Sequence, residues 1–271
     1  MKENNSYWIK DWIKDLQKQG RITFSREEAG NRFPALTEPA IRNALNRLAT
    51  KGDIVSVWKG FYVIVPLKYA SRKIVPPVLY IDDLMKYLKR SYYVGLLNAA
   101  SFYGAAHQQP QDFLVLSTPP ALRDTTKKGI RINFVSRKEI PSLLQSFKTE
   151  TGYVQVSSPE LTAADLITYQ KEVGGLNRAS TILNELSESL NIDTLDKTFF
   201  ENVSVSTIQR LGFLLELVLG QSDLADKLFA KAKENGCTFQ KIPLKTGNKT
   251  EGYEVDSKWK IIINEEIEID E

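Results

Sequence analysis

The sequence predicts an α+β protein in which a small N-terminal module of three helices and a hairpin precedes a larger domain of mixed helices and strands. Two observations predict this class. Apolar residues recur at helical spacing through the first 50 residues, and two β-prone runs flank Lys59-Gly60 directly afterwards. Beyond residue 80, helical patterns alternate with short apolar runs such as Phe113-Leu114-Val115-Leu116, which is typical of a mixed domain.

The composition is that of a globular protein that can bury a core. Hydrophobic residues make up 42% of the chain and charged residues 25%. No run approaches the roughly 18 apolar residues that a membrane span needs, so no membrane partner is expected. The single cysteine, Cys237, excludes an intramolecular disulfide, and the polar N-terminus has no signal-peptide pattern, so we expect a cytoplasmic protein.

Residues 1–66 are expected to form the N-terminal module. Its predicted elements, in order, are helices over about residues 7–19, 26–31 and 38–50 and strands over about 54–58 and 61–65. Ser25 and Glu28 have the spacing of a capping box before the second helix, and Gly52 supplies a left-handed stop after the third. Three helices followed by a hairpin are the element order of a winged helix-turn-helix.

Three prolines within residues 66–78 predict a linker over 67–79, and a larger mixed α/β domain is then expected over 80–271. The helices predicted in this domain cover about residues 81–88, 92–103, 159–171, 177–190, 204–219 and 222–234. The predicted strands cover 112–117 and 130–136, with further short strands between 238 and 263.

The third helix has the pattern of a helix that reads double-stranded DNA. Its buried stripe is expected to be Ile41, Ala44, Leu45 and Leu48. Arg42 and Asn46 then lie one turn apart on the exposed surface, as do Asn43 and Arg47. Arginine pairs bidentately with guanine and asparagine with adenine in the major groove. The alternative is an ordinary solvated helix, which the preceding capping box and the following hairpin make less favourable.

Charge supports the same interpretation. Residues 1–75 hold 14 basic and 7 acidic residues, whereas the rest of the chain holds 22 and 26. Lys59 at the hairpin tip is expected to contact phosphate, and Trp58 beside it to pack. Ser25, Arg26 and Thr37 stand at helix N-termini, where phosphate binds readily, although capping alone would also explain the two hydroxyls.

The natural DNA partner is an operator with an inverted repeat, read by two copies that associate on it, because one such module reads little sequence. The basic segment with Arg123, Lys127 and Lys128 is expected to be a solvated turn, and contact between this segment and DNA remains an open alternative.

No catalytic residue, metal site or cofactor is expected. His107 is the single histidine and Cys237 the single cysteine, so the sequence has no metal-ligand spacing of His and Cys. A histidine-based catalytic triad would have to use His107. His107 is interpreted as structural. The sequence has neither a phosphate-binding GxxxxGK[ST] loop nor a GxGxxG fingerprint.

Several stretches carry a resemblance to a known family. They are the predicted N-terminal winged helix, which ends in Trp58-Lys59-Gly60-Phe61-Tyr62-Val63-Ile64, residues 92–107 (YYVGLLNAASFYGAAH), the run Phe113-Leu114-Val115-Leu116-Ser117, residues 130–135 (IRINFV) and residues 158–167 (SPELTAADLI). In these stretches, which span about residues 5–175, the chain resembles the AbiEi antitoxins of bacterial toxin–antitoxin systems. The C-terminal part beyond about residue 190 is the least similar to that family.

The resemblance implies two activities and no enzyme. The N-terminal domain would bind operator DNA and repress its own operon, and the C-terminal domain would counteract a nucleotidyltransferase-like toxin. The alternatives are a ligand- or protein-sensing transcriptional regulator with no toxin partner, and a module that binds protein through its N-terminal domain. The excess of basic residues in the N-terminal part disfavours the last.

Overall fold

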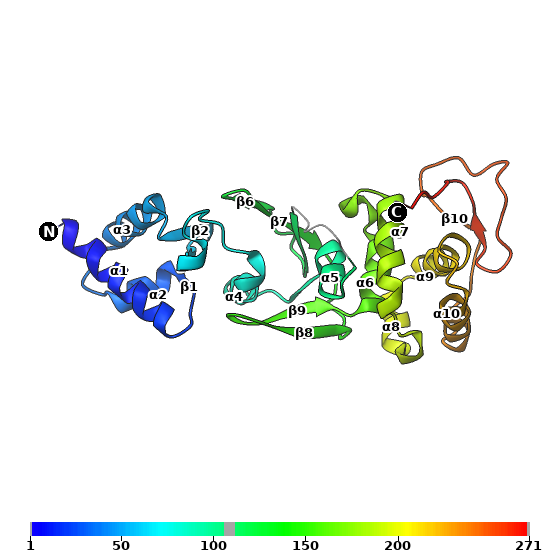
Figure 1. Cartoon of the computed structure of the whole chain (residues 1–271), viewed down its shortest axis with the longest axis horizontal. Helices are drawn as coiled ribbons and strands as arrows, with labels where there is room; N and C mark the ends of the chain where they lie inside the picture. The colour runs from blue at the N-terminus through cyan, green and yellow to red at the C-terminus, as the bar shows by residue number, and fades with distance from the viewer. Residues whose placement is uncertain (1, 106–111, 270–271) are drawn as a thin grey trace. The chain divides into compact units, whose positions relative to one another are not determined.

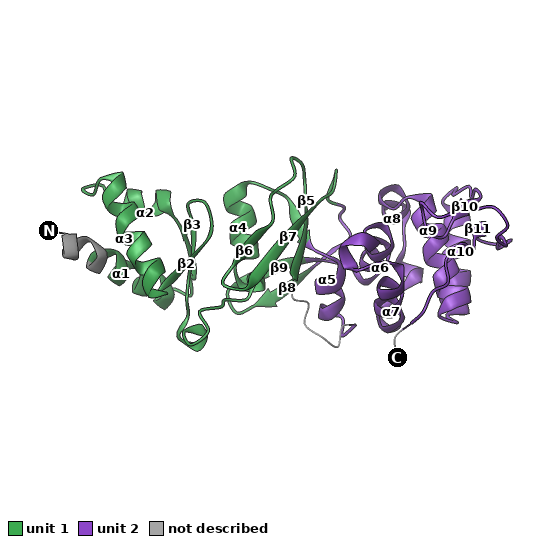
Figure 2. Cartoon of the chain, turned by 90° about the horizontal axis from the view of Figure 1, so that it is seen from above, with its two compact units in different colours: residues 1–93, 111–140, 146–155 green, residues 94–110, 141–145, 156–271 purple. Residues whose placement is uncertain are grey.

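A computed structural model describes residues 2–105 and 112–269, so His107 lies outside the described residues (Figure 1). Contacts within the chain divide it into two compact units (Figure 2). Unit 1 comprises Met1–Tyr93, Gln111–Ile140 and Ser146–Gln155, and unit 2 comprises Val94–Pro110, Pro141–Gln145 and Val156–Glu271. These units are defined by contacts and not by independent folding. The division into an N-terminal domain ending at residue 66 and a larger domain beginning at residue 80 therefore stays a prediction.

The first part of unit 1 contains three helices and a three-stranded sheet. Its elements are α1 (Lys2–Lys18), β1 (Thr23–Ser25), α2 (Arg26–Arg32), α3 (Glu38–Lys51), β2 (Ile54–Trp58) and β3 (Phe61–Ile64). The predicted helices and hairpin are therefore confirmed, and α1 begins earlier than predicted because the polar residues before Tyr7 contain no helix breaker. The strands lie in the order β1-β3-β2, and β3 pairs antiparallel with both neighbours.

One hydrophobic core holds this module together. The apolar faces of α1, α2 and α3 meet the inner face of the sheet. Trp12 of α1 contacts Phe24 and Phe33 edge-on, with ring centroids 5.1 and 5.9 Å apart. The buried members of the core are Ile9, Ile13, Leu16, Phe24, Ala29, Ile41, Ala44, Leu45, Leu48, Ile54, Tyr62 and Ile64.

A six-stranded sheet follows, in the order β6-β7-β5-β4-β9-β8. Two short 3-10 turns, Leu67–Tyr69 and Pro77–Leu79, and helix α4 (Ile81–Leu88) precede it. The strands are β4 (Tyr92–Val94), β5 (Asp112–Ser117), β6 (Thr125–Lys127), β7 (Ile130–Ser136), β8 (Leu144–Thr149) and β9 (Gly152–Ser157). β5 pairs parallel with β7, and β6 pairs antiparallel with β7. The predicted helix 81–88 and the predicted strands 112–117 and 130–136 are confirmed.

The helix predicted over 92–103 is wrong in its first part. Residues 92–94 form the buried strand β4, and α5 (Leu96–Phe102) begins only after Gly95, whose backbone is extended. Tyr92, Tyr93 and Val94 are aromatic or β-branched, and such residues favour a buried strand over a helix. Strands β8 and β9 were not predicted.

Unit 2 is mainly helical. Its later elements are α6 (Pro159–Thr168), α7 (Leu176–Leu186), α8 (Lys197–Asn202), α9 (Val205–Phe213), a π-helical turn (Leu214–Val218), α10 (Ser222–Glu234), β10 (Ile242–Pro243) and β11 (Ile261–Ile262). α6 is buried from Pro159 to Ile167, as a central helix must be. Trp259, near the end of the described chain, is fully buried. No described helix is both long and apolar enough to cross a membrane.

Candidate nucleic-acid interface

Helix α3 separates its two faces as the sequence predicts. Ile41, Ala44, Leu45 and Leu48 are buried in the core of the N-terminal module. Arg42, Asn43, Asn46 and Arg47 are all exposed. Since the inner face is fixed by packing, the outer face offers two guanidinium groups and two amides on a rigid support.

Both ends of α3 are defined by local chemistry. Thr37 stands at the N-cap with an extended backbone and an exposed side chain that makes no capping bond, and Pro39 occupies the first turn. At the other end Gly52 adopts a left-handed conformation with φ of 83° and donates its N–H to the Leu48 carbonyl at 3.0 Å. The Lys73 ammonium adds a hydrogen bond to the Lys51 carbonyl oxygen at 3.0 Å.

Helix α2 begins with an N-cap residue whose side chain forms the capping hydrogen bond. The Ser25 hydroxyl accepts the Glu28 N–H at 2.9 Å, so the predicted cap is confirmed. The Glu28 carboxylate accepts two hydrogen bonds from Arg21, at 2.7 and 3.0 Å. The Arg26 guanidinium lies 3.7 Å from the Glu38 carboxylate, which joins the starts of α2 and α3. Ser25, Arg26 and α3 are thus brought together at one side of the module.

The β2–β3 turn is packed on both sides of its tip. Lys59 has an exposed side chain, while its carbonyl oxygen accepts the Tyr87 hydroxyl at 3.1 Å. Trp58 packs edge-on against Phe134 of β7, with ring centroids 5.9 Å apart. The Arg26 N–H donates to the Gly60 carbonyl at 2.8 Å, so the turn lies beside the start of α2. The turn therefore presents the Lys59 side chain from a backbone that three neighbouring elements hold.

Two contributors to this site were missed in the sequence. Lys73 comes from the segment predicted as a linker, and Tyr87 comes from α4, and neither position carries a local signal of its partner. One signal was available on α4 itself. Asp83 and Tyr87 lie four residues apart in the helix predicted over 81–88, so these two side chains share one face of that helix.

An open cleft of about 380 Å³ lies beside the start of α2. Polar groups dominate its lining, among them Arg21, Thr23, Glu28, Asp83 and Tyr87. Arg21 is paired with Glu28, and the Thr23 hydroxyl donates to the Asp83 carboxylate at 2.5 Å. Within the described ranges 2–105 and 112–269, no group of three or more His, Cys, Asp or Glu side chains could hold a metal ion.

The segment 158–167 forms the start and body of α6. The Ser158 hydroxyl accepts the Leu161 N–H at 3.2 Å, and Pro159 fills the first helical position. The Glu160 carboxylate is buried and accepts the Asn191 N–H at 2.9 Å, which ties α6 to the segment after α7. The Thr162 hydroxyl lies 2.6 Å from that of Ser157. These polar residues organise the core of unit 2.

Comparison with solved structures supports the fold. The structure resembles the crystal structure of the RV2827C protein from Mycobacterium tuberculosis, with a TM-score of 0.65, at 15% sequence identity, over 94% of this chain and 91% of that one. A nucleotidyltransferase-like antigenic protein from Paracoccidioides brasiliensis is also matched, over 57% of this chain and 91% of that one, at 12% identity. Its TM-score of 0.38 is too low to relate the two folds.

Comparison with protein families finds a match in the part of the chain that follows the N-terminal module. No curated protein matches the sequence. Residues 93–217 match the family model of the AbiEi antitoxin C-terminal domain. The match contains three of the stretches that suggested the family, in β5, β7 and α6. Over residues 93–217, a little under half of the chain, the protein is therefore similar to the AbiEi-type antitoxins.

Proposed function

We propose that the protein is a cytoplasmic antitoxin and transcriptional autorepressor, in which residues 1–66 act as a winged helix-turn-helix that binds operator DNA. The observation that carries this proposal is the outer face of α3. Arg42, Asn43, Asn46 and Arg47 are exposed on it, while the opposite face is buried. In this proposal α3 enters the major groove, where arginine and asparagine distinguish base pairs.

The phosphate backbone would be held by groups around α3. Ser25 and Arg26 at the start of α2, Thr37 at the start of α3 and Lys59 in the β2–β3 turn are the proposed contacts. Thr37 is the best placed of the hydroxyls because its side chain is exposed and makes no capping bond. The Ser25 hydroxyl oxygen already accepts the Glu28 N–H as a cap, so Ser25 would bind phosphate by donating its own O–H.

The antitoxin domain in residues 93–217 supports the second half of the proposal. Its partner would be a nucleotidyltransferase-like toxin whose effect the protein counteracts. No catalytic step and no cofactor belong to this proposal. The test is a growth assay in cells that express a toxin gene neighbouring this one, with and without the full chain. Rescue of growth supports an antitoxin, and unrelieved toxicity contradicts it.

Autorepression has its own test. A reporter gene is placed behind the DNA upstream of this gene, and the full chain is supplied from a second promoter. Repression by the wild-type chain and its loss in Arg42→Ala are expected. Two copies should occupy an inverted repeat, so one chain per natural operator in a stoichiometric titration would contradict that part of the proposal.

The cleft beside α2 favours a second candidate function, a winged-helix regulator that senses a ligand or protein and has no toxin partner. The cleft is polar, and it adjoins Ser25 and Glu28 at the α2 cap. An occupant would therefore act on one of the proposed DNA-binding helices. Repression of the reporter together with no rescue of any neighbouring toxin would favour this candidate.

A further inference from the structure

We infer that Tyr87 is a positioning residue for the DNA contact proposed at the β2–β3 turn; this inference rests on the proposed DNA-binding function. Tyr87 lies on α4, outside the three helices and the hairpin. Its hydroxyl donates to the Lys59 carbonyl oxygen at 3.1 Å, and its ring packs against Phe61 with centroids 5.3 Å apart. One side chain thus holds the turn on both sides of Gly60, while the Lys59 side chain stays exposed.

The turn is shaped to receive this tyrosine. Gly60 has φ of 78°, a left-handed conformation that glycine adopts without strain. A Cβ atom at position 60 would lie 2.8 Å from the Tyr87 hydroxyl oxygen. Glycine is therefore favoured at position 60 for two reasons: its backbone conformation, and the close approach of the Tyr87 hydroxyl, which a Cβ atom would displace.

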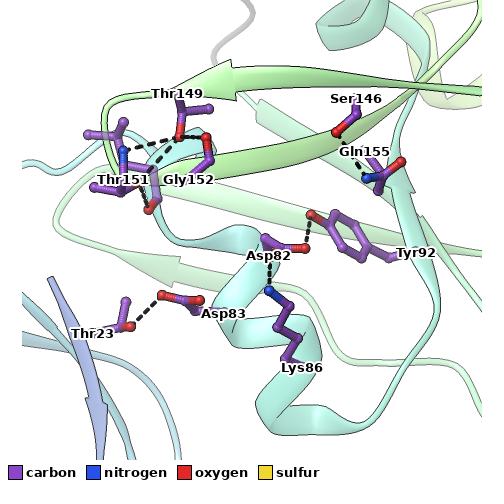
Figure 3. Close-up of polar contacts among 11 residues, drawn as sticks. Thr23, Asp82, Asp83, Lys86, Tyr92, Ser146, Thr149, Thr151, Gly152 and Gln155 are labelled. Carbon is purple, nitrogen blue, oxygen red and sulfur yellow. Dashed lines mark hydrogen bonds and ion pairs between the residues drawn. The ribbon is translucent and has the colours of Figure 1, made fainter. Parts of the chain in front are cut away.

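Helix α4 forms a second hydrogen bond to the N-terminal module. Asp83 lies one turn before Tyr87 on the same face of α4, and its carboxylate accepts the Thr23 hydroxyl at 2.5 Å (Figure 3). Thr23 is buried in β1 and pairs with Val63 of β3. The two contacts therefore hold β1 and the β2–β3 turn at once.

The same helix is itself anchored to the larger sheet. Asp82, beside Asp83, accepts the Tyr92 hydroxyl of β4 at 3.0 Å and forms an ion pair with Lys86 at 2.5 Å (Figure 3). Burial, aided by the nearby Asp82 charge, raises the pKa of Tyr92, so its hydroxyl stays protonated and able to donate at pH values where a free tyrosine would ionise. Tyr87 thus projects from a support that is fixed on two sides.

This arrangement lowers the entropic cost of a contact between Lys59 and phosphate. A two-residue turn at the end of a ribbon is mobile on its own, and a lysine side chain loses further freedom when it binds. A turn held in advance has less freedom left to lose, and such preorganisation raises affinity without any new contact. Tyr87 would thus strengthen DNA binding without touching DNA.

A double-mutant cycle tests the inference. The affinity of the full chain for a duplex from upstream of its own gene is measured for wild type, Tyr87→Phe, Lys59→Ala and the double variant. Tyr87→Phe keeps the ring and removes the hydroxyl, so the fold is retained and binding should weaken roughly two- to tenfold. In the Lys59→Ala background the same change should have no further effect.

Two further readouts separate positioning from a general structural role. Lys59→Ala should reduce the salt slope of binding by about one, and Tyr87→Phe should reduce it by part of that amount. The matched control is Tyr153→Phe, which removes a hydroxyl from a tyrosine that is 59% exposed on β9 and should change nothing.

Each contrary result has a distinct meaning. An equal loss from Tyr87→Phe in both backgrounds overturns the inference, because the effect would not pass through Lys59. Unchanged affinity in both Tyr87→Phe and Lys59→Ala also overturns the inference. If Arg42→Ala still weakens binding in that case, the DNA-binding function stands. A wild-type chain that binds no duplex refutes the proposed function itself.

Discussion

The Lys73 ammonium donates to the Lys51 carbonyl oxygen at 3.0 Å, so a residue 22 positions downstream closes the C-terminal end of α3. The last carbonyl groups of a helix lack hydrogen-bond partners within the helix and carry the negative end of its dipole. A lysine ammonium there donates a hydrogen bond to a carbonyl oxygen and places a positive charge beside the negative end of the dipole. The segment between the N-terminal module and α4 therefore stabilises the helix that we propose reads DNA.

Replacement of Lys73 by methionine should lower the free energy of unfolding by about 0.3–1 kcal/mol, because a charged partner of the helix terminus is lost. Urea denaturation of the full chain measures the change. Lys128→Met is the matched control, since Lys128 is exposed and lies outside α3. Equal stability of the two variants would show that the hydrogen bond contributes nothing.

Gly212→Ala should destabilise unit 2. A Cβ atom at position 212 would lie 2.1 Å from the Cη2 atom of Trp259, whose indole is fully buried and donates to Glu216 at 2.7 Å. Relief of this overlap should cost about 1–3 kcal/mol. Gly30→Ala is the control, because nothing lies near a Cβ at that helical position and alanine favours helix. A wild-type melting temperature for Gly212→Ala would contradict the packing described.

The proposed DNA contacts should fall into two classes. Arg42→Ala or Arg47→Ala should cost roughly 1–3 kcal/mol on the operator and little on unrelated DNA, since base contacts are lost. Lys59→Ala should weaken binding to every duplex alike, since a phosphate contact carries no sequence information. Titrations against operator and unrelated duplexes measure both effects. If the arginine variants bind the operator normally, α3 is not the reading helix.

Cys237 should react slowly with a thiol reagent in the native protein. Its side chain is 9% exposed, and burial raises the pKa of the thiol, so little thiolate forms at neutral pH. The nearby Lys233 ammonium opposes the shift but does not outweigh it. The rate of reaction with a chromogenic disulfide reagent should rise sharply in denaturant. An equally fast reaction in buffer would show that Cys237 is accessible.

The sequence predicts α3 well because the period of its apolar residues decides both faces at once. Ile41, Ala44, Leu45 and Leu48 are buried, and the four polar residues between them are exposed. The Ser25 cap was predicted from a similar short-range rule, and the Glu28 N–H donates a hydrogen bond to the Ser25 hydroxyl oxygen at 2.9 Å. Local periodicity and capping chemistry were sufficient for the helices and hairpin of the N-terminal module.

The remaining features depend on contacts between residues far apart in the chain. Tyr92-Tyr93-Val94 precede a helix-forming segment, and only their burial within the sheet decides that they form a strand. Strand β8 has few apolar residues and little burial, which weakens its strand signal, whereas the alternation of Val154, Gln155 and Val156 in β9 is a short signal that was overlooked. The bonds of Tyr87 to Lys59 and of Asp83 to Thr23 join segments 28 and 60 positions apart, so no local pattern predicts them.

Fluorescence anisotropy of the full chain with DNA from upstream of its own gene tests the central claim most directly. A scrambled duplex of the same composition serves as the comparison, and both are titrated at two salt concentrations. The account predicts tighter binding to the native duplex, weakened as salt rises because phosphate contacts release counterions. No binding, or equal binding to both duplexes, would contradict it.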